Sequence, residues 1–145
     1  MKDYRLLTEA EWEFVARADT TSPFWFGETV SPQQANYNSD QSYPGIERSV
    51  PFGCTLPVDR YAPNPWGLYQ VHGNVWKWCE DPWHDDCANA PGDGSAWLQG
   101  GDDQYRVLRG GSWHHAPWHL RSANRFRNRP DQRLVTQGFR IARNL

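Results

Sequence analysis

The chain has 145 residues, of which 38% are hydrophobic and 14% aromatic, so it holds enough material for one domain with a core but not for two. No run approaches the roughly 18 apolar residues that a membrane helix needs, and residues 1–20 lack the charged-then-apolar pattern of a secretory signal. We therefore expect no membrane insertion and, by default, a cytoplasmic location. Three cysteines without a CxxC pair argue against a disulfide framework and a zinc ribbon, although one bridge between Cys79 and Cys87 stays open.

The formal net charge of -2 conceals an uneven distribution. Residues 106–145 contain nine Arg and one Asp, whereas residues 1–105 contain six basic and sixteen acidic residues. These two parts should attract each other. The arginine-rich part contains no Lys, is interleaved with Gly, Pro and Trp, and has an acidic partner in the same chain, so we expect no binding to nucleic acid.

The first predicted element is a helix that begins at a capping box. The Thr8 hydroxyl can accept from the amide three residues on, while the Glu11 side chain returns to the cap amide. Trp12, Val15 and Ala16 then fall on one face, which predicts a helix of about ten residues that packs this side inward and ends near Asp19.

Residues 20–65 are rich in Pro, Gly, Ser, Asn and Gln around isolated aromatic residues, a pattern typical of a long loop packed down by ring side chains rather than of disorder. The expected ring anchors are Trp25, Phe26, Tyr37, Tyr43 and Phe52.

Strands are expected in the second half of the chain. The pattern of residues 68–79 predicts a short strand, a turn and a second strand with Trp76 and Trp78 on one face. An acidic loop over residues 81–104 should precede a strand at 105–108, a turn follows at 109–113, and a closing strand is expected at 138–142.

Four stretches in order carry a resemblance: RLLTEAEWEFVARA at 5–18, NPWGLYQVHGNVWKWCED at 64–81, RVLRGGSW at 106–113 and GFRIAR at 138–143. Together they resemble the formylglycine-generating-enzyme-like, or sulfatase-modifying-factor, family. The resemblance implies an α+β, C-type-lectin-like fold of this subtype, loop-rich, with short antiparallel strands and few helices. It also implies a single domain over residues 1–145 that lacks the stretch usually found ahead of the first helix.

The catalytic members of the family depend on a copper-binding cysteine pair shortly after the RGGS turn, because soft thiolates hold Cu(I). Here no cysteine follows Cys87, so we expect no formylglycine generation. The sulfoxide synthases of the same fold place iron on histidines of a separate helical domain that this chain does not contain. Ser112 lacks the Gly-x-Ser-x-Gly context of an activated nucleophile, and the turn accounts for it.

The resemblance also implies two calcium positions, since hard oxygen ligands suit this ion. The first aligns with Asn36 and Tyr37, but the later acidic ligand falls on Val50. In the second, Lys77 replaces the family's Glu. No other cofactor is expected.

A third branch of the family consists of the variable proteins of diversity-generating retroelements, and residues 113–137 are most like their variable segment. A frame of RGGSW, RSANR, PD and GFR surrounds chemically miscellaneous residues. In such proteins, rewriting the adenines of Asn codons gives His, Ala, Phe, Arg, Leu, Val or Thr, so Trp118, Gln132 and Gln137 would need other template codons or belong to the frame. The candidate ligand-binding residues are His114, His115, Ala116, Trp118, His119, Phe126, Arg127, Arg129, Gln132, Leu134, Val135 and Thr136.

Aromatic and cationic side chains dominate binding hot spots, so we interpret the chain as a non-catalytic domain that binds a protein or another macromolecule. Three alternatives stay open. The apolar residues Trp118, Phe126, Leu134 and Val135 could instead fill the core, with the Arg and His residues in ordinary surface pairs, although His114, His115 and His119 could also bind zinc or copper. The chain could be a fragment of a copper- or iron-dependent oxidoreductase whose missing ligands come from another chain or domain. The chain could also be an architectural accessory domain.

Overall fold

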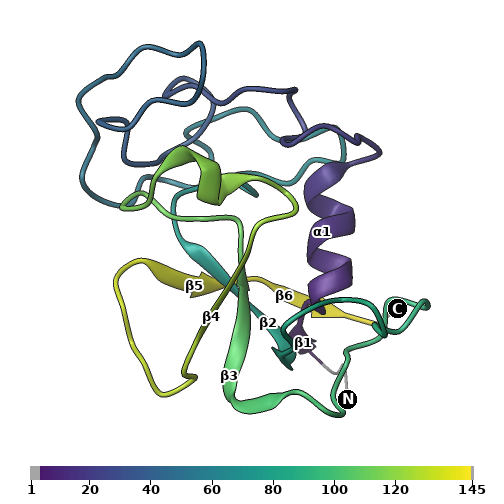
Figure 1. Ribbon diagram of the computed structural model, residues 1–145. Helices are drawn as coiled ribbons and strands as arrows, with labels where there is room; N and C mark the ends of the chain where they lie inside the picture. Colours follow the sequence, from purple (N-terminus) through teal and green to yellow (C-terminus); the bar gives the residue numbers. More distant parts are fainter. Residues whose placement is uncertain (1–3, 145) are drawn as a thin grey trace.

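The computed structural model describes residues 4–144, in which long loops lie over a small mixed sheet flanked by one helix (Figure 1). This confirms the loop-rich α+β architecture expected from the resemblance. The elements, in chain order, are β1 (Tyr4–Leu6), α1 (Glu9–Arg17), β2 (Trp76–Trp83), β3 (Asp102–Arg109), the 3-10 helix η1 (Pro117–Leu120), β4 (Arg125–Asn128), β5 (Gln137–Phe139) and β6 (Ile141–Arg143).

Helix α1 begins at the predicted capping box. The Thr8 hydroxyl accepts from the backbone N–H of Glu11 at 3.0 Å, and the Glu11 carboxylate accepts from the N–H of Thr8 at 2.9 Å. Ala18 adopts a left-handed conformation with φ of 45°, and its N–H donates to the carbonyl of Phe14, so the helix ends within two residues of the predicted position. Trp12 and Ala16 are buried on the inward face, as expected.

The main sheet has the order β4-β3-β2-β5, and β1 pairs with β6 in a separate two-stranded sheet. The pairs β2–β3 and β3–β4 are antiparallel, but β5 runs parallel to β2, which corrects the expectation of antiparallel strands throughout. The parallel pair arises because the chain leaves the outer strand β4, crosses the sheet through residues 129–136 and returns beside β2 in the same direction.

Several predicted strand boundaries were wrong. Residues 68–71 form no strand. The Asn64 backbone N–H and carbonyl bond to Leu68 and Gly67 and close a turn over residues 64–68 just before them. The acidic loop is shorter than expected: β2 continues to residue 83, and β3 already begins at 102. The predicted closing strand is divided at Arg140 into β5 and β6, which pair with different partners.

The predicted ring anchors hold most of the long loop. Phe24 and Tyr37 are buried in a cluster with Val30, Ala35 and Leu120, and the partly buried Phe26 and Tyr43 pack against it. A second cluster joins α1 to the sheet through Trp12, Ala16, Val71, Cys79 and Val107, with Trp25 packed against it. Phe52 is the exception, since it is 51% exposed and anchors nothing of this core.

Two expectations about chemistry are settled by the described residues. The three cysteines are free thiols, so there is no Cys79–Cys87 bridge. The basic and acidic parts of the chain do meet, because Arg109 and Arg125 both form ion pairs with Glu9. Within residues 4–144, no helix is both long and apolar enough to cross a bilayer.

Candidate functional site

Residues 113–137 leave the RGGS turn, form η1 and β4, and return to the sheet at β5 (Figure 1). Their first part is fixed to the long loop, since the backbone N–H of Asn38 donates to the carbonyl of His115 at 3.0 Å and that of Ser122 to the carbonyl of Pro23 at 2.7 Å. Leu120 is fully buried below η1, while Trp118 on the same turn is 43% exposed. The segment is therefore anchored by a few side chains and leaves others free to face solvent.

Four aromatic rings form what we call the histidine–aromatic cluster: Trp76, His115, His119 and Phe126. The ring of Phe126 stacks on Trp76 with centroids 5.0 Å apart. His115 and His119 meet the same indole edge-on at 5.4 and 6.2 Å. Side chains from β2, from the segment around η1 and from β4, which lie far apart in the sequence, thus pack against one another.

Contacts with two buried polar groups fix the orientation of the His115 ring. Its Nδ1 lies 2.7 Å from the buried Ser112 hydroxyl and 3.3 Å from the Trp76 indole N–H. An indole N–H can only donate, so Nδ1 is the acceptor and the ring proton resides on Nε2. Burial, followed by the neighbouring His119 and His114, lowers the pKa of His115 to about 4, so the ring is neutral at physiological pH. Ser112 orients the ring and is itself inaccessible, in agreement with its role in the turn.

The other candidate residues are exposed near the cluster, lie away from it, or are buried. His114 is exposed and lies edge-on to His115 at 5.8 Å, and Leu134 and Val135 are 47% and 79% exposed. Thr136 returns to the cluster, because its carbonyl accepts from the Trp76 backbone N–H at 2.8 Å. The exposure of the four apolar residues Trp118, Phe126, Leu134 and Val135 rules out the alternative in which they fill the core.

Three candidates lie away from the cluster. Arg127 alternates with Phe126 on β4, and its guanidinium stacks on Trp83 and Tyr105 at 5.1 and 4.9 Å, on the opposite side of the sheet. Arg129 pairs with Asp131 on the exposed loop at 3.3 Å, and Gln132 is exposed there. The sequence pattern alone did not separate these residues, because it ignores the alternation of side chains along β4.

Ala116 is 5% exposed and therefore cannot contribute a broad contact. Conversely, sequence reasoning placed Trp76 in the supporting hairpin, although its ring is the centre of the cluster. Its position in the GNVWKW stretch predicted burial but not the partners it gathers.

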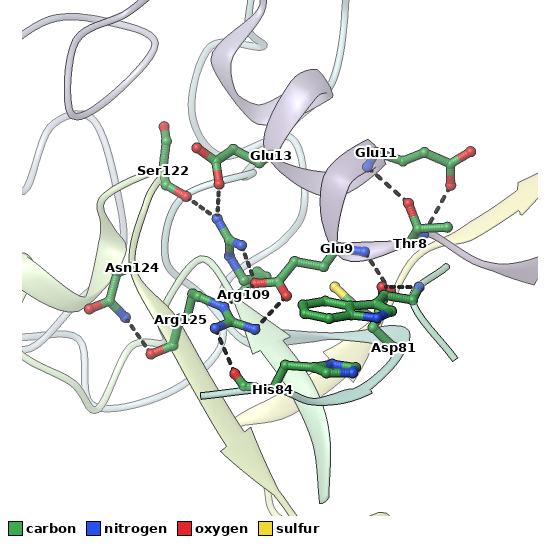
Figure 2. A network of polar contacts seen from close by, with 12 residues as sticks. Thr8, Glu9, Glu11, Glu13, Asp81, His84, Arg109, Ser122, Asn124 and Arg125 are labelled. Carbon is green, nitrogen blue, oxygen red and sulfur yellow. Dashed lines mark hydrogen bonds and ion pairs between the residues drawn. The ribbon is translucent and has the colours of Figure 1, made fainter. Parts of the chain in front are cut away.

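A charged network supports the segment from the side of α1 (Figure 2). Arg109, 2% exposed at the end of β3, donates to Glu9 and Glu13 at 2.5 Å each and to the carbonyl of Ser122. Arg125 at the start of β4 donates to both carboxylate oxygens of Glu9, at 2.7 and 2.8 Å, and to the carbonyl of His84. Burial would raise the pKa of Glu13, but Arg109 and Arg17 outweigh it and hold the pKa below its usual range. Such bidentate and shared pairs fix both ends of the segment 110–124.

The family model of the sulfatase-modifying factor enzyme 1-like domain matches residues 1–145. The chain belongs to this family. Among curated relatives, it is 38% identical to the serine/threonine-protein kinase pkn1 of Chlamydia caviae over 97% of its own length and 21% of the kinase. It is 35% identical to the formylglycine-generating enzyme of Thermomonospora curvata over 95% of its length and 48% of that enzyme. An inactive formylglycine-generating enzyme 2 from Bos taurus is 32% identical over 95% of the chain and 43% of that protein.

Solved structures of family members have the same fold. PvdO from Pseudomonas aeruginosa superposes with a TM-score of 0.85 at 38% identity, over 99% of this chain and 54% of that one. Variable protein 1 of Treponema denticola superposes with a TM-score of 0.71 at 31% identity, over 97% of this chain and 47% of that one. The chain thus spans about half of these structures and about a fifth of the kinase.

The calcium positions implied by the family were tested on the donor sets. At the GNVWKW turn the Lys77 ammonium itself donates to the carbonyls of Gly73 at 2.6 Å and Val71 at 3.1 Å, so a cation of the protein already engages these oxygens and calcium does not fit. Near Asn36 the residue expected to supply the acidic ligand is Val50, which is 90% exposed. In residues 4–144 no three His, Cys, Asp or Glu side chains gather as a metal site, and His114, His115 and His119 are no exception.

Proposed function

We propose that this domain is a non-catalytic binding module of the family and that the accessible rings of the histidine–aromatic cluster, with the exposed His114, Trp118, Leu134 and Val135, form its ligand-binding face. Trp76, which is 1% exposed, supports these rings from the core. The observation that carries the proposal is the contrast within residues 109–137. Frame residues Arg109, Ser112 and Ser122 are buried, whereas the candidate residues in the gaps, apart from Ala116, are exposed or line the cluster. Loops on a fixed scaffold can change sequence without unfolding the core.

The ligand that suits this face is a protein surface. The cluster offers aromatic rings and imidazole donors for stacking and hydrogen bonding, and the same segment adds the exposed arginines Arg121 and Arg133. Broad aromatic faces of this kind are typical of protein recognition, whereas small substrates are usually held in deep pockets. The likeness to the Treponema denticola variable protein supports the further proposal that residues 113–137 are diversified by a retroelement.

The decisive experiment is to sequence the DNA that flanks the gene. The proposal expects a near-copy of codons 106–140 that differs from them at adenines and lies beside a reverse-transcriptase gene. An ordinary locus without such a repeat would contradict diversification. Binding itself is tested with Trp118→Ala and Phe126→Ala once a ligand is in hand, because these variants should lose binding while they keep their thermal stability.

A second candidate function follows from the relatives. The match to about a fifth of the Chlamydia caviae kinase means that this kind of domain also occurs as one part of a larger chain. An architectural accessory role predicts no repeat beside the gene and no shift in stability with any ligand. The enzymatic alternative is tested by metal analysis of the purified protein, in which stoichiometric copper or iron would contradict the non-catalytic proposal.

A further inference from the structure

The side of β2 that faces away from the histidine–aromatic cluster holds a buried lysine. Successive residues of a strand point to opposite faces, so Lys77 lies behind Trp76. Lys77 is 3% exposed and donates to the carbonyls of Val71 and Gly73. An ammonium has three donors, so one N–H has no partner among the described residues. None of the ion pairs in residues 4–144 includes Lys77.

A second cation lies beside it. Arg140, between β5 and β6, donates through its Nη2 to the carbonyl of Tyr69, but its Nε is buried without a partner. Arg140 also forms no ion pair with a described residue. Burial, followed by the nearby charge of Arg140, lowers the pKa of Lys77, and no carboxylate opposes the shift. Burial likewise lowers the pKa of Arg140.

Both side chains line one small cavity of about 150 Å³, whose remaining walls are Val58, Gln70, Asn74, Val75 and Phe139. Asn74 is engaged with Leu56 and Asn36, so the charged donors of the wall come from the two cations. Gln70 gives its amide N–H to the carbonyl of Pro57, and its buried Oε1 has no donor. This last atom requires a hydrogen from a water that enters with the ligand.

We propose that Lys77 and Arg140 form a binding site for a small monoanion of halide or carboxylate type. Two partly or fully buried cations without a counter-ion are unfavourable, and a single anion in the cavity that both side chains line neutralises charge and can accept from the third N–H of Lys77. The site is independent of the proposed binding face, since it joins the turn at Gly73 to the β5–β6 junction on the other side of β2.

The test is thermal unfolding at neutral pH and constant ionic strength, with sodium formate replacing sodium gluconate, whose anion is bulky. The wild-type Tm should rise saturably, by about 4 °C at roughly ten times Kd. Arg140→Gln should weaken formate binding at least tenfold. Arg143→Gln removes a neighbouring exposed arginine of equal charge and should leave the formate response unchanged. A linear rise, or equal responses of wild type and Arg140→Gln, would overturn the proposal.

Chlorine NMR gives a reading that needs no variant. The wild-type domain should broaden the chloride line, and added formate should remove the broadening by competition for one site. If the line stays sharp and formate leaves the Tm unchanged, Lys77 is a neutral amine and the anion site does not exist. This outcome would leave the proposed binding face untouched.

Discussion

The two halves of the segment between β3 and β5 are held in opposite ways. Residues 109–125 are fixed by buried partners: Arg109 meets Glu9 and Glu13, Leu120 fills the loop core, and Arg125 meets Glu9 from the next strand. Residues 126–136 have mainly exposed side chains and one local ion pair, Arg129 with Asp131. The comparison suggests that stability is concentrated where the segment begins and that chemical variation is tolerated where it ends. Four predictions test this contrast, from the largest effect to the smallest.

Removal of the buried guanidinium should have the largest effect. Arg109→Met removes the buried cation shared by Glu9 and Glu13, which keep only Arg125 and Arg17. It also removes the donor to the Ser122 carbonyl and the cation–π contact with Trp12 at 5.0 Å, so the free energy of unfolding should fall by about 3–5 kcal/mol. Urea denaturation measures the change. The control Arg133→Met removes an exposed arginine of the second half and should change stability by no more than about 0.5 kcal/mol. Similar losses of unfolding free energy in both variants would show that the charged network around Arg109 stabilises the fold no more than an exposed arginine does.

The same leucine-to-alanine substitution can be made in each half of the segment. Leu120 is fully buried and Leu134 is 47% exposed, and both lie in the candidate segment. Leu120→Ala should cost about 2–5 kcal/mol, because it leaves a cavity beside Phe24 and Tyr37. Leu134→Ala should cost about 0.5 kcal/mol. The difference is measured by denaturant unfolding at one temperature; a costly Leu134→Ala would return this side chain to the core.

Part of the support for the first half could be predicted from the sequence. The capping box fixes the start of α1 through contacts within four residues, and the asymmetry of charge anticipates the pairing of Arg109 and Arg125 with Glu9. The family motifs predicted the architecture, which the structure and the family match bear out.

The remainder depends on contacts between distant segments. The parallel pairing of β5 with β2 is decided by the path of the loop across the sheet, for which residues 129–136 carry no pattern. The same holds for the histidine–aromatic cluster, because Trp76 is 39 to 50 residues from its partners and its environment is set by how the segment around η1 and β4 packs on it. Arg127 was assigned to the face because the gap pattern treats all its residues alike, whereas strand alternation places it against Trp83.

Low pH should reduce the stability of the fold, because two imidazoles are shielded from water in the folded state. Burial lowers the pKa of His72 to about 3 and that of His115 to about 4, against 6.5 for an unburied histidine. Both rings are neutral in the folded state, so the unfolded chain takes up protons first as the pH falls below 6.5. Stability should therefore be complete above this pH and decline below it, by up to about 1.4 kcal/mol per pH unit for the fully buried His72 and by less for the half-buried His115.

Urea unfolding between pH 6.5 and 4.5 measures this decline before the carboxylates of Glu11 and Glu13 are protonated. His72→Gln should remove one of the two contributions to the slope, and the half-buried His115→Gln should remove a smaller one. An unchanged slope in His72→Gln would mean that its ring, although bonded to the carbonyl of Leu120 at 2.7 Å, is not the group that resists protonation.

The smallest effect is expected at the tip of the second half, where Val135 is 79% exposed. Val135→Thr keeps the shape of the side chain and places the new hydroxyl in water, so stability should change by no more than about 0.5 kcal/mol. The matched variant Val107→Thr makes the same change in the fully buried centre of β3, where the hydroxyl has no water to replace and should cost about 1–3 kcal/mol. Thermal unfolding of both variants beside the wild type gives the two values. Equal costs would mean that residues 126–136 are held as firmly as the sheet, in which case a diversified face could not be built there; a small cost at Val135 alone is what such a face requires.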